Sequence, residues 1–165
     1  MKKANTLFLA QGAMIAALYV VLTYICNLFG LANGVIQIRF SEALTILPFF
    51  TPAAIPGLFV GCLLSNILTG CIIWDTIFGS LATLIGAFVT YKLRKLSPWL
   101  APLPPILANM IVVPLVLIYA YGVPDGYFYL LGTIGAGEVI SCGVLGMILL
   151  FALRPASKRI FRIEN

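Results

Sequence analysis

Long apolar runs separated by short polar connections make up most of this chain. The runs cover residues 7–29, 37–51, 57–71, 76–91, 106–121 and 127–153. Most of them approach the length of about 20 residues that a helix needs to cross a bilayer. Prolines and glycines in the connections block helix continuation, as the two prolines between residues 51 and 56 illustrate. The pattern predicts an all-α integral membrane protein with a single transmembrane domain over residues 1–165.

The run at residues 37–51 is short for a crossing and could instead be re-entrant. The positions of Lys and Arg decide between the two topologies, because these residues concentrate in cytoplasmic loops. Basic clusters lie at the N-terminus, after the fourth run and after the sixth run, and comprise Lys2, Lys3, Lys92, Arg94, Lys95, Arg154, Lys158, Arg159 and Arg162. All three clusters fall on one side only if the short run crosses. We therefore predict six transmembrane helices with the N and C termini cytoplasmic.

The composition supports a membrane protein and excludes several classes of function. Hydrophobic residues make up 62% of the chain, against about 45–50% in soluble domains. The net charge of +5 comes mainly from the basic clusters, which are typical topology signals, so we expect no nucleic-acid partner. The chain has no histidine, which removes the usual general base and the usual zinc ligand. We therefore expect neither an enzyme nor a metal site. The four cysteines lack CxxC spacing and are interpreted as small buried hydrophobes.

A few charged and polar residues interrupt the apolar runs, where each is costly unless it is paired or lines a polar cavity. Arg39 and Glu42 are three residues apart, so they share one face of a helix. With six crossings, both lie near the outer surface together with Asp75. Asn66 then lies about 9 Å and Glu138 about 16 Å below that surface, at 1.5 Å per residue. The sequence thus predicts a binding cavity that opens to the outside.

Acidic residues dominate this outer region, where Glu42, Asp75, Asp125 and Glu138 accompany one basic residue, Arg39. Each acid also has an interpretation without a ligand. Glu42 could pair only with Arg39, and Glu138 could be a neutral acid bonded to another helix. The two aspartates could be solvated loop charges. The residues alone leave these alternatives open.

The sequence contains no recognisable source of energy for transport. The G-x-x-x-x-G-K-[ST] motif of P-loop ATPases is absent. The inner halves of the runs hold almost no ionisable residues, which argues against a proton-coupled pump because protons need a route. An outward cavity without an inner pathway indicates a capture subunit that is driven by partner proteins.

Two stretches, QIRFSEALTILPFFTPAAIPGLFVGCLLSNI and WDTIFGSLATLIGA, resemble the QueT family, the substrate-binding S components of energy-coupling factor (ECF) transporters assigned to queuosine precursors. The resemblance covers nearly the whole chain and implies a six-helix S-component-type bundle in the bacterial cytoplasmic membrane. It also implies partners, namely the transmembrane coupling protein EcfT and two cytoplasmic ATPase subunits. The partners bind ATP, so this chain needs no cofactor. Ala13 and Ala17 match the Ala-x-x-x-Ala surface through which the first helix docks on the coupling protein.

The substrate that this resemblance implies is a 7-deazaguanine such as queuine or preQ1. Its guanine-like edge offers adjacent N–H and amino donors to a carboxylate. Its carbonyl oxygen suits Arg39, Asn66 or Asn109, and its flat ring suits stacking on Phe40 or Trp74. The substrate-binding residues expected on this basis are Arg39, Phe40, Glu42, Asn66, Trp74, Asp75, Asn109 and Glu138. Another vitamin-like solute is the alternative substrate, and a small membrane enzyme or assembly factor is the alternative class.

Overall fold

The computed structural model describes residues 2–31 and 37–161, and these residues form helices without any β-strand. In chain order the helices are α1 (Lys2–Leu28), the 3₁₀ helix η1 (Phe40–Phe49), α2 (Ala54–Leu68), α3 (Ile73–Leu93), η2 (Pro98–Leu100), α4 (Leu103–Tyr119), α5 (Tyr127–Glu138), the π-helical η3 (Val139–Leu145), α6 (Gly146–Leu153), η4 (Arg154–Ala156) and α7 (Ser157–Phe161). The all-α class predicted from the sequence is confirmed.

Within the described residues, four segments are long and apolar enough to cross a membrane: Asn5–Leu28, Ile73–Leu93, Pro98–Tyr119 and Tyr127–Ala156. Two apolar helices, η1 with 10 residues and α2 with 15, are shorter. They extend roughly 20 Å and 22 Å at the usual rise per residue, which is less than the hydrocarbon core of about 30 Å. Four of the described segments therefore have the length and apolarity of a membrane span, and six crossings stay a prediction.

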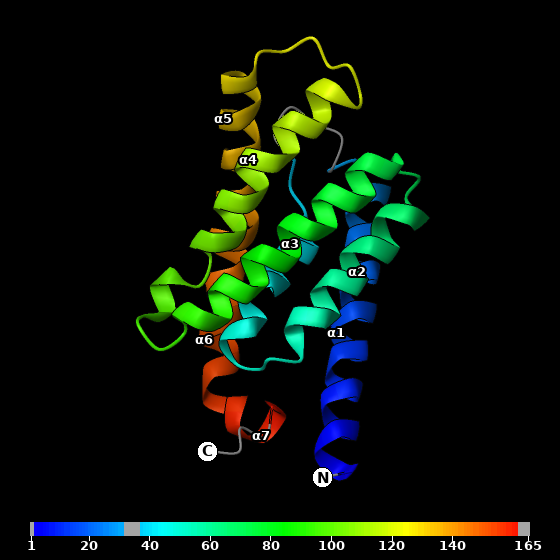
Figure 1. Ribbon diagram of the computed structural model, residues 1–165. Helices are drawn as coiled ribbons and strands as arrows, with labels where there is room; N and C mark the ends of the chain where they lie inside the picture. Colours follow the sequence, from blue (N-terminus) through cyan, green and yellow to red (C-terminus); the bar gives the residue numbers. More distant parts are fainter. Residues whose placement is uncertain (1, 32–36, 162–165) are drawn as a thin grey trace.

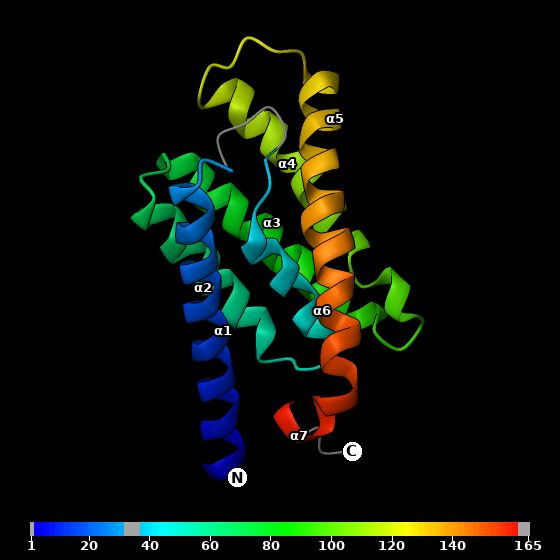
Figure 2. The same cartoon turned by 180° about the vertical axis from the view of Figure 1, so that it is seen from behind.

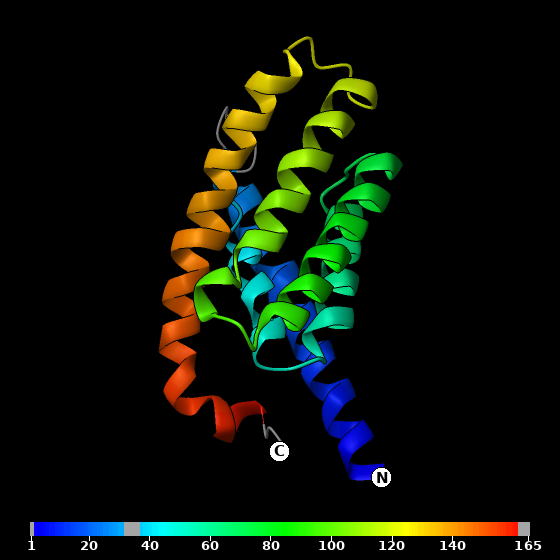
Figure 3. The ribbon, with the colours of Figure 1, turned by 60° about the vertical axis from the view of Figure 1, so that its left-hand side comes forward.

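The main helices alternate in direction through one bundle. α1, α2 and α4 run one way, and α3 and the continuous α5–α6 segment run the other way (Figure 1). The start of α1 and the short α7 lie at one end of the molecule, and the α4–α5 connection lies at the opposite end. Seen from behind, α1 and the α5–α6 segment flank η1 (Figure 2). Figure 3 shows α3, α4 and α5 side by side, in agreement with their contacts.

The short helix η1 forms the centre of the bundle. It contacts α1, α3, η3 and α6, and its residues from Ser41 to Pro48 are all buried. Its polar side chains bond within the protein, since Thr45 Oγ1 donates to the Glu42 carbonyl oxygen at 2.6 Å and Thr23 Oγ1 donates to Ser41 Oγ at 2.8 Å. Such internal bonding removes most of the cost of burying polar groups. It explains how a segment with three polar residues can lie among apolar helices.

Small residues let α1 approach α2 closely. A Cβ atom at Gly57 would lie only 2.7 Å from the carbonyl oxygen of Gly12, and Ala16, one turn further along α1, is buried. Ala13 and Ala17 are both exposed. The helix thus carries two pairs of small residues, each pair one turn apart. Gly12 and Ala16 pack against α2, whereas Ala13 and Ala17 lie on the surface of the bundle.

The last membrane-length segment, Tyr127–Ala156, contacts the extended residues just before η1. A Cβ atom at Gly137 would overlap the carbonyl oxygen of Gln37, so the two backbones are in direct contact. The backbone N–H of Arg39 donates to Ser141 Oγ at 3.1 Å. Directly after Glu138 the span adopts the π-helical turn η3, a feature that is frequent at functional sites. These contacts fix Gln37 and Arg39 beside the last span.

Candidate functional site

A polar cavity of about 340 Å³ lies among α1, α2, α3, α4 and the extended segment before η1. It is lined by Thr23, Asn27, Gln37, Arg39, Asn66, Thr69, Gly70, Cys71, Asp75, Val113, Leu117 and Tyr121. Pockets that bind small molecules have volumes of about 300–1,000 Å³. The cavity therefore has room for a compact ligand such as a bicyclic base.

Helical spacing explains how separate elements supply the walls of this cavity. Val113 and Leu117 are four apart on α4, and Tyr121, just past its end, continues the same interval. Residues four apart lie on one face of a helix. The same face carries Asn109 one turn deeper, and Tyr19 lies one turn deeper than the lining residues of α1. The next layer of side chains below the cavity is therefore polar.

Asp75 is the carboxylate among the lining residues. It lies in the first turn of α3, where the helix dipole favours a negative charge. Tyr121 Oη donates to Asp75 Oδ2 at 3.1 Å, and Asn66 Nδ2 donates to the Asp75 carbonyl oxygen at 3.5 Å. Asp75 Oδ1 accepts no hydrogen bond from the described residues. One oxygen of this carboxylate is thus available to a ligand.

Tyr121 connects the end of α4 to the start of α3. Besides donating to Asp75, its hydroxyl oxygen accepts from the backbone N–H of Ile72 at 3.3 Å. Partial burial, together with the negative charge of Asp75, raises the pKa of Tyr121 to about 12. The hydroxyl consequently stays protonated at physiological pH and keeps donating to the carboxylate.

The guanidinium of Arg39 also has unused hydrogen-bonding capacity. Its Nη2 donates to Gln37 Oε1 at 3.5 Å, and it forms no ion pair with any carboxylate in residues 2–31 and 37–161. A guanidinium offers five N–H donors. The alternative in which Arg39 and Glu42 only neutralise each other as a direct pair is therefore absent from this structure. Donors of Arg39 are free to meet an acceptor in the cavity.

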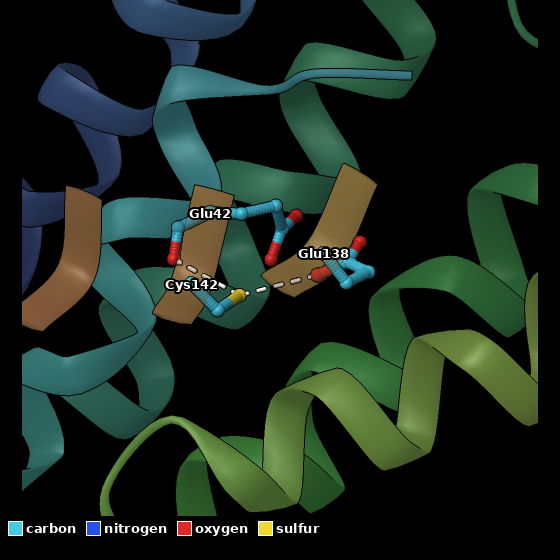
Figure 4. Close-up of side chains that lie close together, drawn as sticks. All are labelled: Glu42, Glu138 and Cys142. Carbon is cyan, nitrogen blue, oxygen red and sulfur yellow. Dashed lines mark hydrogen bonds between the residues drawn. The ribbon is translucent and has the colours of Figure 1, made fainter. Parts of the chain in front are cut away.

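Beneath the cavity lies a cluster of buried side chains, which we call the carboxyl layer: Tyr19, Glu42, Asn109, Glu138 and Cys142. Figure 4 shows the carboxyl groups of Glu42 and Glu138 facing each other, with Cys142 beside them. Tyr19 Oη and Asn109 Nδ2 each donate to one carboxylate oxygen of Glu42. Asn109 Nδ2 at 3.0 Å and Cys142 Sγ at 3.1 Å donate to the two oxygens of Glu138. All four carboxylate oxygens thus have a donor inside the protein.

The carboxyl layer also has side chains of a kind that bind metal ions. Ligand atoms of Glu42, Glu138 and Cys142 lie within 4.8 Å of one another. The oxygens of both glutamates are already bonded to protein donors, and Cys142 Sγ lies 3.4 Å from the Glu42 carbonyl oxygen as well. Internal hydrogen bonds account for this arrangement, and we assign no metal to it.

The structure separates the residues that the sequence suggests for substrate binding. Three of them line the cavity, namely Arg39, Asn66 and Asp75. Three others belong to the carboxyl layer, namely Glu42, Asn109 and Glu138. The remaining two, Phe40 and Trp74, lie in neither group. Arg39 and Phe40 are neighbours in sequence, but of the two only Arg39 lines the cavity.

Trp74 and Phe40 do not line the polar cavity. Trp74 is 55% exposed and stacks on Phe78 with ring centroids 6.0 Å apart. Both rings line a separate apolar groove between α3 and α4. Phe40 is half-buried, and its backbone N–H donates to Cys26 Sγ at 3.1 Å. The aromatic ring among the lining residues is that of Tyr121.

Tyr121, Gln37 and Cys71 also line the cavity and are absent from the substrate-binding residues expected from the sequence. For Tyr121 a signal exists, because it follows Asn109 by three intervals of four residues along α4. Gln37 and Cys71 lie outside the regular helices, so periodicity carries no information about them. Their place in the wall depends on how the connections fold over the bundle.

An all-helical fold with four membrane-length spans and a polar cavity defines a multi-pass membrane protein that can hold a small polar solute. Residues 9–155 match the family model described as QueT transporter, and the chain belongs to this family. The family resemblance noted in the sequence is confirmed. The protein is a multi-pass cell-membrane protein of a transporter family and not an enzyme.

A relative with a known name is the queuosine precursor transporter QueT of Lactococcus lactis subsp. cremoris (strain MG1363). The two chains are 41% identical over 86 residues, which are 52% of this chain and 50% of the relative. The match therefore spans half the length of that relative. No solved structure matches this chain.

Proposed function

We propose that this protein is the substrate-capture (S) component of an ECF-type importer and that its cavity binds a 7-deazaguanine such as queuine or preQ1. The observation that carries the proposal is one cavity that holds both a carboxylate and a guanidinium with unused hydrogen-bonding capacity. Membership of the QueT transporter family and the queuosine precursor named for the Lactococcus relative support this substrate class.

A guanine-type base complements the two groups. Asp75 can accept hydrogen bonds from the base edge, which carries a ring N–H beside an amino group. Arg39 can donate to the carbonyl oxygen of the base. Glu42 and Glu138 are less suited to the base edge, since their oxygens are already bonded in the carboxyl layer. We therefore assign the base edge to Asp75.

We further propose that all six main apolar segments cross the membrane and that both chain ends are cytoplasmic. η1 and α2 run in opposite directions between the longer spans, as two consecutive crossings would (Figure 1). The C-terminal ends of α3 and α6 lie at the end of the bundle away from the α4–α5 connection (Figure 1), and basic residues, among them Lys92, Arg94 and Arg154, stand at these helix ends. Lys and Arg mark the cytoplasmic side, so the cavity opens to the outside.

The sequence contains no P-loop motif. We propose that the transmembrane coupling protein EcfT and two cytoplasmic ATPase subunits supply the driving force. Ala13 and Ala17 are exposed on α1, where small side chains would let a partner helix approach closely. This surface is proposed to dock on the coupling protein.

Titration calorimetry on the purified protein tests the substrate class. We expect queuine or preQ1 to bind at least about a hundredfold more tightly than riboflavin, thiamin or biotin, because charge-assisted hydrogen bonds to Asp75 and Arg39 distinguish them. Equal or tighter binding of any of these vitamins would overturn the assignment.

The variants Ala13→Trp and Ala17→Trp test the partner assignment. A bulky side chain prevents close helix approach, so we expect loss of ATP-driven uptake and of co-purification with the coupling protein. Substrate affinity of the isolated protein should not change. The control Ile85→Trp, on the exposed side of α3, should behave as the wild type does. Normal uptake by the two alanine variants would place the docking surface elsewhere.

A further inference from the structure

Tyr121 joins the end of α4 to the start of α3 at the edge of the cavity. Its hydroxyl donates to Asp75 Oδ2 at 3.1 Å and accepts from the Ile72 backbone N–H at 3.3 Å. The side chain is 43% exposed, so burial of its ring contributes less than for a core aromatic residue. The hydrogen bonds of its hydroxyl are the specific contribution of this residue.

A carboxylate that is held through one oxygen presents the other oxygen in a defined direction. Asp75 is only 8% exposed, and its Oδ1 has no donor among the described residues. Gly79 lies one turn along α3, and a Cβ atom there would be in ordinary van der Waals contact with Asp75 Oδ1 at 3.6 Å and with Asn66 Nδ2 at 3.4 Å. Asp75 and Asn66 both line the cavity, so the carboxylate with the free acceptor belongs to the cavity wall.

We infer that Tyr121 is a positioning residue for ligand selectivity: by holding Asp75 Oδ2, it orients Asp75 Oδ1 to accept from the exocyclic amino group of a guanine-type base. The inference rests on the proposed function, because a 7-deazaguanine carries this amino group. It extends that function by assigning selectivity among bicyclic bases to the contact between Asp75 and Tyr121, which joins the ends of two different helices.

The pair selects by the pattern of donors on the ligand. A guanine-type base offers a ring N–H and an amino group to one carboxylate, whereas a hypoxanthine-type base offers only the ring N–H. A site built to bond a polar group rejects the analogue that lacks it, because its own buried polar atom is then left unpaired. Loss of one charge-assisted hydrogen bond corresponds to about a ten- to hundredfold weaker affinity.

Each protein is titrated with 7-deazaguanine and with 7-deazahypoxanthine, which lacks only the amino group. The proteins are the wild type, Tyr121→Phe, Asp75→Asn and the variant that carries both substitutions. Tyr119→Phe is the matched control, because Tyr119 is 84% exposed at the end of α4 and does not line the polar cavity. The measured quantity is the ratio of the two dissociation constants for each protein.

We expect a ratio of about 10 to 100 for the wild type and for Tyr119→Phe. Tyr121→Phe should lower the ratio several-fold, mainly by weakening the binding of 7-deazaguanine. In the Asp75→Asn background, Tyr121→Phe should change the ratio no further, because Tyr121 acts through Asp75.

Three results would overturn the inference. Tyr121→Phe could leave the ratio unchanged, as when it weakens both ligands equally, which would reduce Tyr121 to a packing role. A wild-type protein that binds both bases tightly and equally would retain the proposed substrate class but refute selection by the amino group. A wild-type protein that binds neither base refutes the proposed function, and the inference with it.

Discussion

The carboxylate of Asp75 in the cavity wall and the carboxylates of Glu42 and Glu138 in the carboxyl layer differ in how many of their oxygens are bonded within the protein. Each oxygen of Glu42 and Glu138 accepts from Tyr19, Asn109 or Cys142. Asp75 has one oxygen bonded to Tyr121 and one without a donor from the described residues. All three residues are buried, so burial does not distinguish them. We propose Asp75 as the acid that binds the ligand because it alone of the three has an oxygen with no donor from the described residues.

The two regions also differ in what their hydrogen bonds connect. The bonds of the carboxyl layer link α1, η1, α4 and the last span through the side chains of Tyr19, Glu42, Asn109 and Glu138. Helices in lipid gain little from hydrophobic burial against one another, so such interhelical bonds help to specify their packing. We therefore expect damage to the carboxyl layer to reduce stability first and damage to the cavity wall to reduce affinity first.

The largest effect is expected for Glu42→Ala. This change leaves Tyr19 Oη without its acceptor and Asn109 with one acceptor instead of two, and it opens a space at the centre of the bundle. Unsatisfied buried polar groups cost about 1–3 kcal/mol each, so we expect a loss of about 3 kcal/mol or more, seen as a lower thermal unfolding midpoint in detergent. Asp125→Ala, in an exposed connection, is the control. An unchanged midpoint for Glu42→Ala would contradict a stabilising role for the layer.

Next in size is the effect of Asp75→Asn on affinity. The amide offers one acceptor where the carboxylate offers two, so bonding to Tyr121 leaves an N–H₂ group facing the donors of the base. We expect the dissociation constant for a 7-deazaguanine to rise about ten- to a hundredfold, as measured by titration calorimetry.

Glu138→Gln is the matched change in the carboxyl layer. Because Glu138 does not line the cavity, we expect its affinity to stay within about threefold of the wild-type value, with a lower unfolding midpoint. A large loss of affinity in a folded Glu138→Gln variant would mean that the ligand reaches the carboxyl layer.

Gly137→Ala tests how the last span places Arg39 in the cavity. The added methyl group overlaps the Gln37 carbonyl oxygen, so the segment from Gln37 to Arg39 must shift. Overpacking of this kind costs about 1–3 kcal/mol, and we expect roughly tenfold weaker binding in calorimetry. Gly132→Ala on the same helix meets nothing within 4 Å and should bind ligand normally. Similar affinities for the two variants would show that the contact between Gly137 and Gln37 does not influence ligand binding.

The smallest effect concerns the cysteines. Cys71 lines the cavity and is half-buried, whereas Cys142 in the carboxyl layer is fully buried, as is Cys26. We expect N-ethylmaleimide to label Cys71 first and a 7-deazaguanine to slow this labelling several-fold, since a bound ligand excludes the reagent. Mass spectrometry of the labelled peptides measures both rates, and Cys71→Ser is the control. An equal labelling rate of Cys71 with and without the ligand would place the binding site away from this cavity.

The sequence by itself determined the class of the protein and much of its element map. Apolar runs at residues 7–29 and 106–121 correspond to α1 (Lys2–Leu28) and α4 (Leu103–Tyr119) within a few residues. This is possible because the length and apolarity of a span are local properties that the bilayer imposes on each segment separately. The motif around QIRF likewise sufficed for the family, since it needs only residue identities in order.

Only the tertiary structure separated the polar residues that line the cavity from those that bond to one another in the carboxyl layer. From the sequence, Glu42, Asp75 and Glu138 are all candidates for substrate binding, each with its own alternative interpretation. Whether donors from other helices reach their oxygens is visible only in the structure. The sequence suggests Trp74 as a stacking ring, but Trp74 lies in the apolar groove between α3 and α4. The aromatic ring that lines the cavity is that of Tyr121, just past the end of α4. Hydrogen-bond satisfaction is a property of the assembled bundle, because it is set by the side chains that packing brings within about 3 Å of one another.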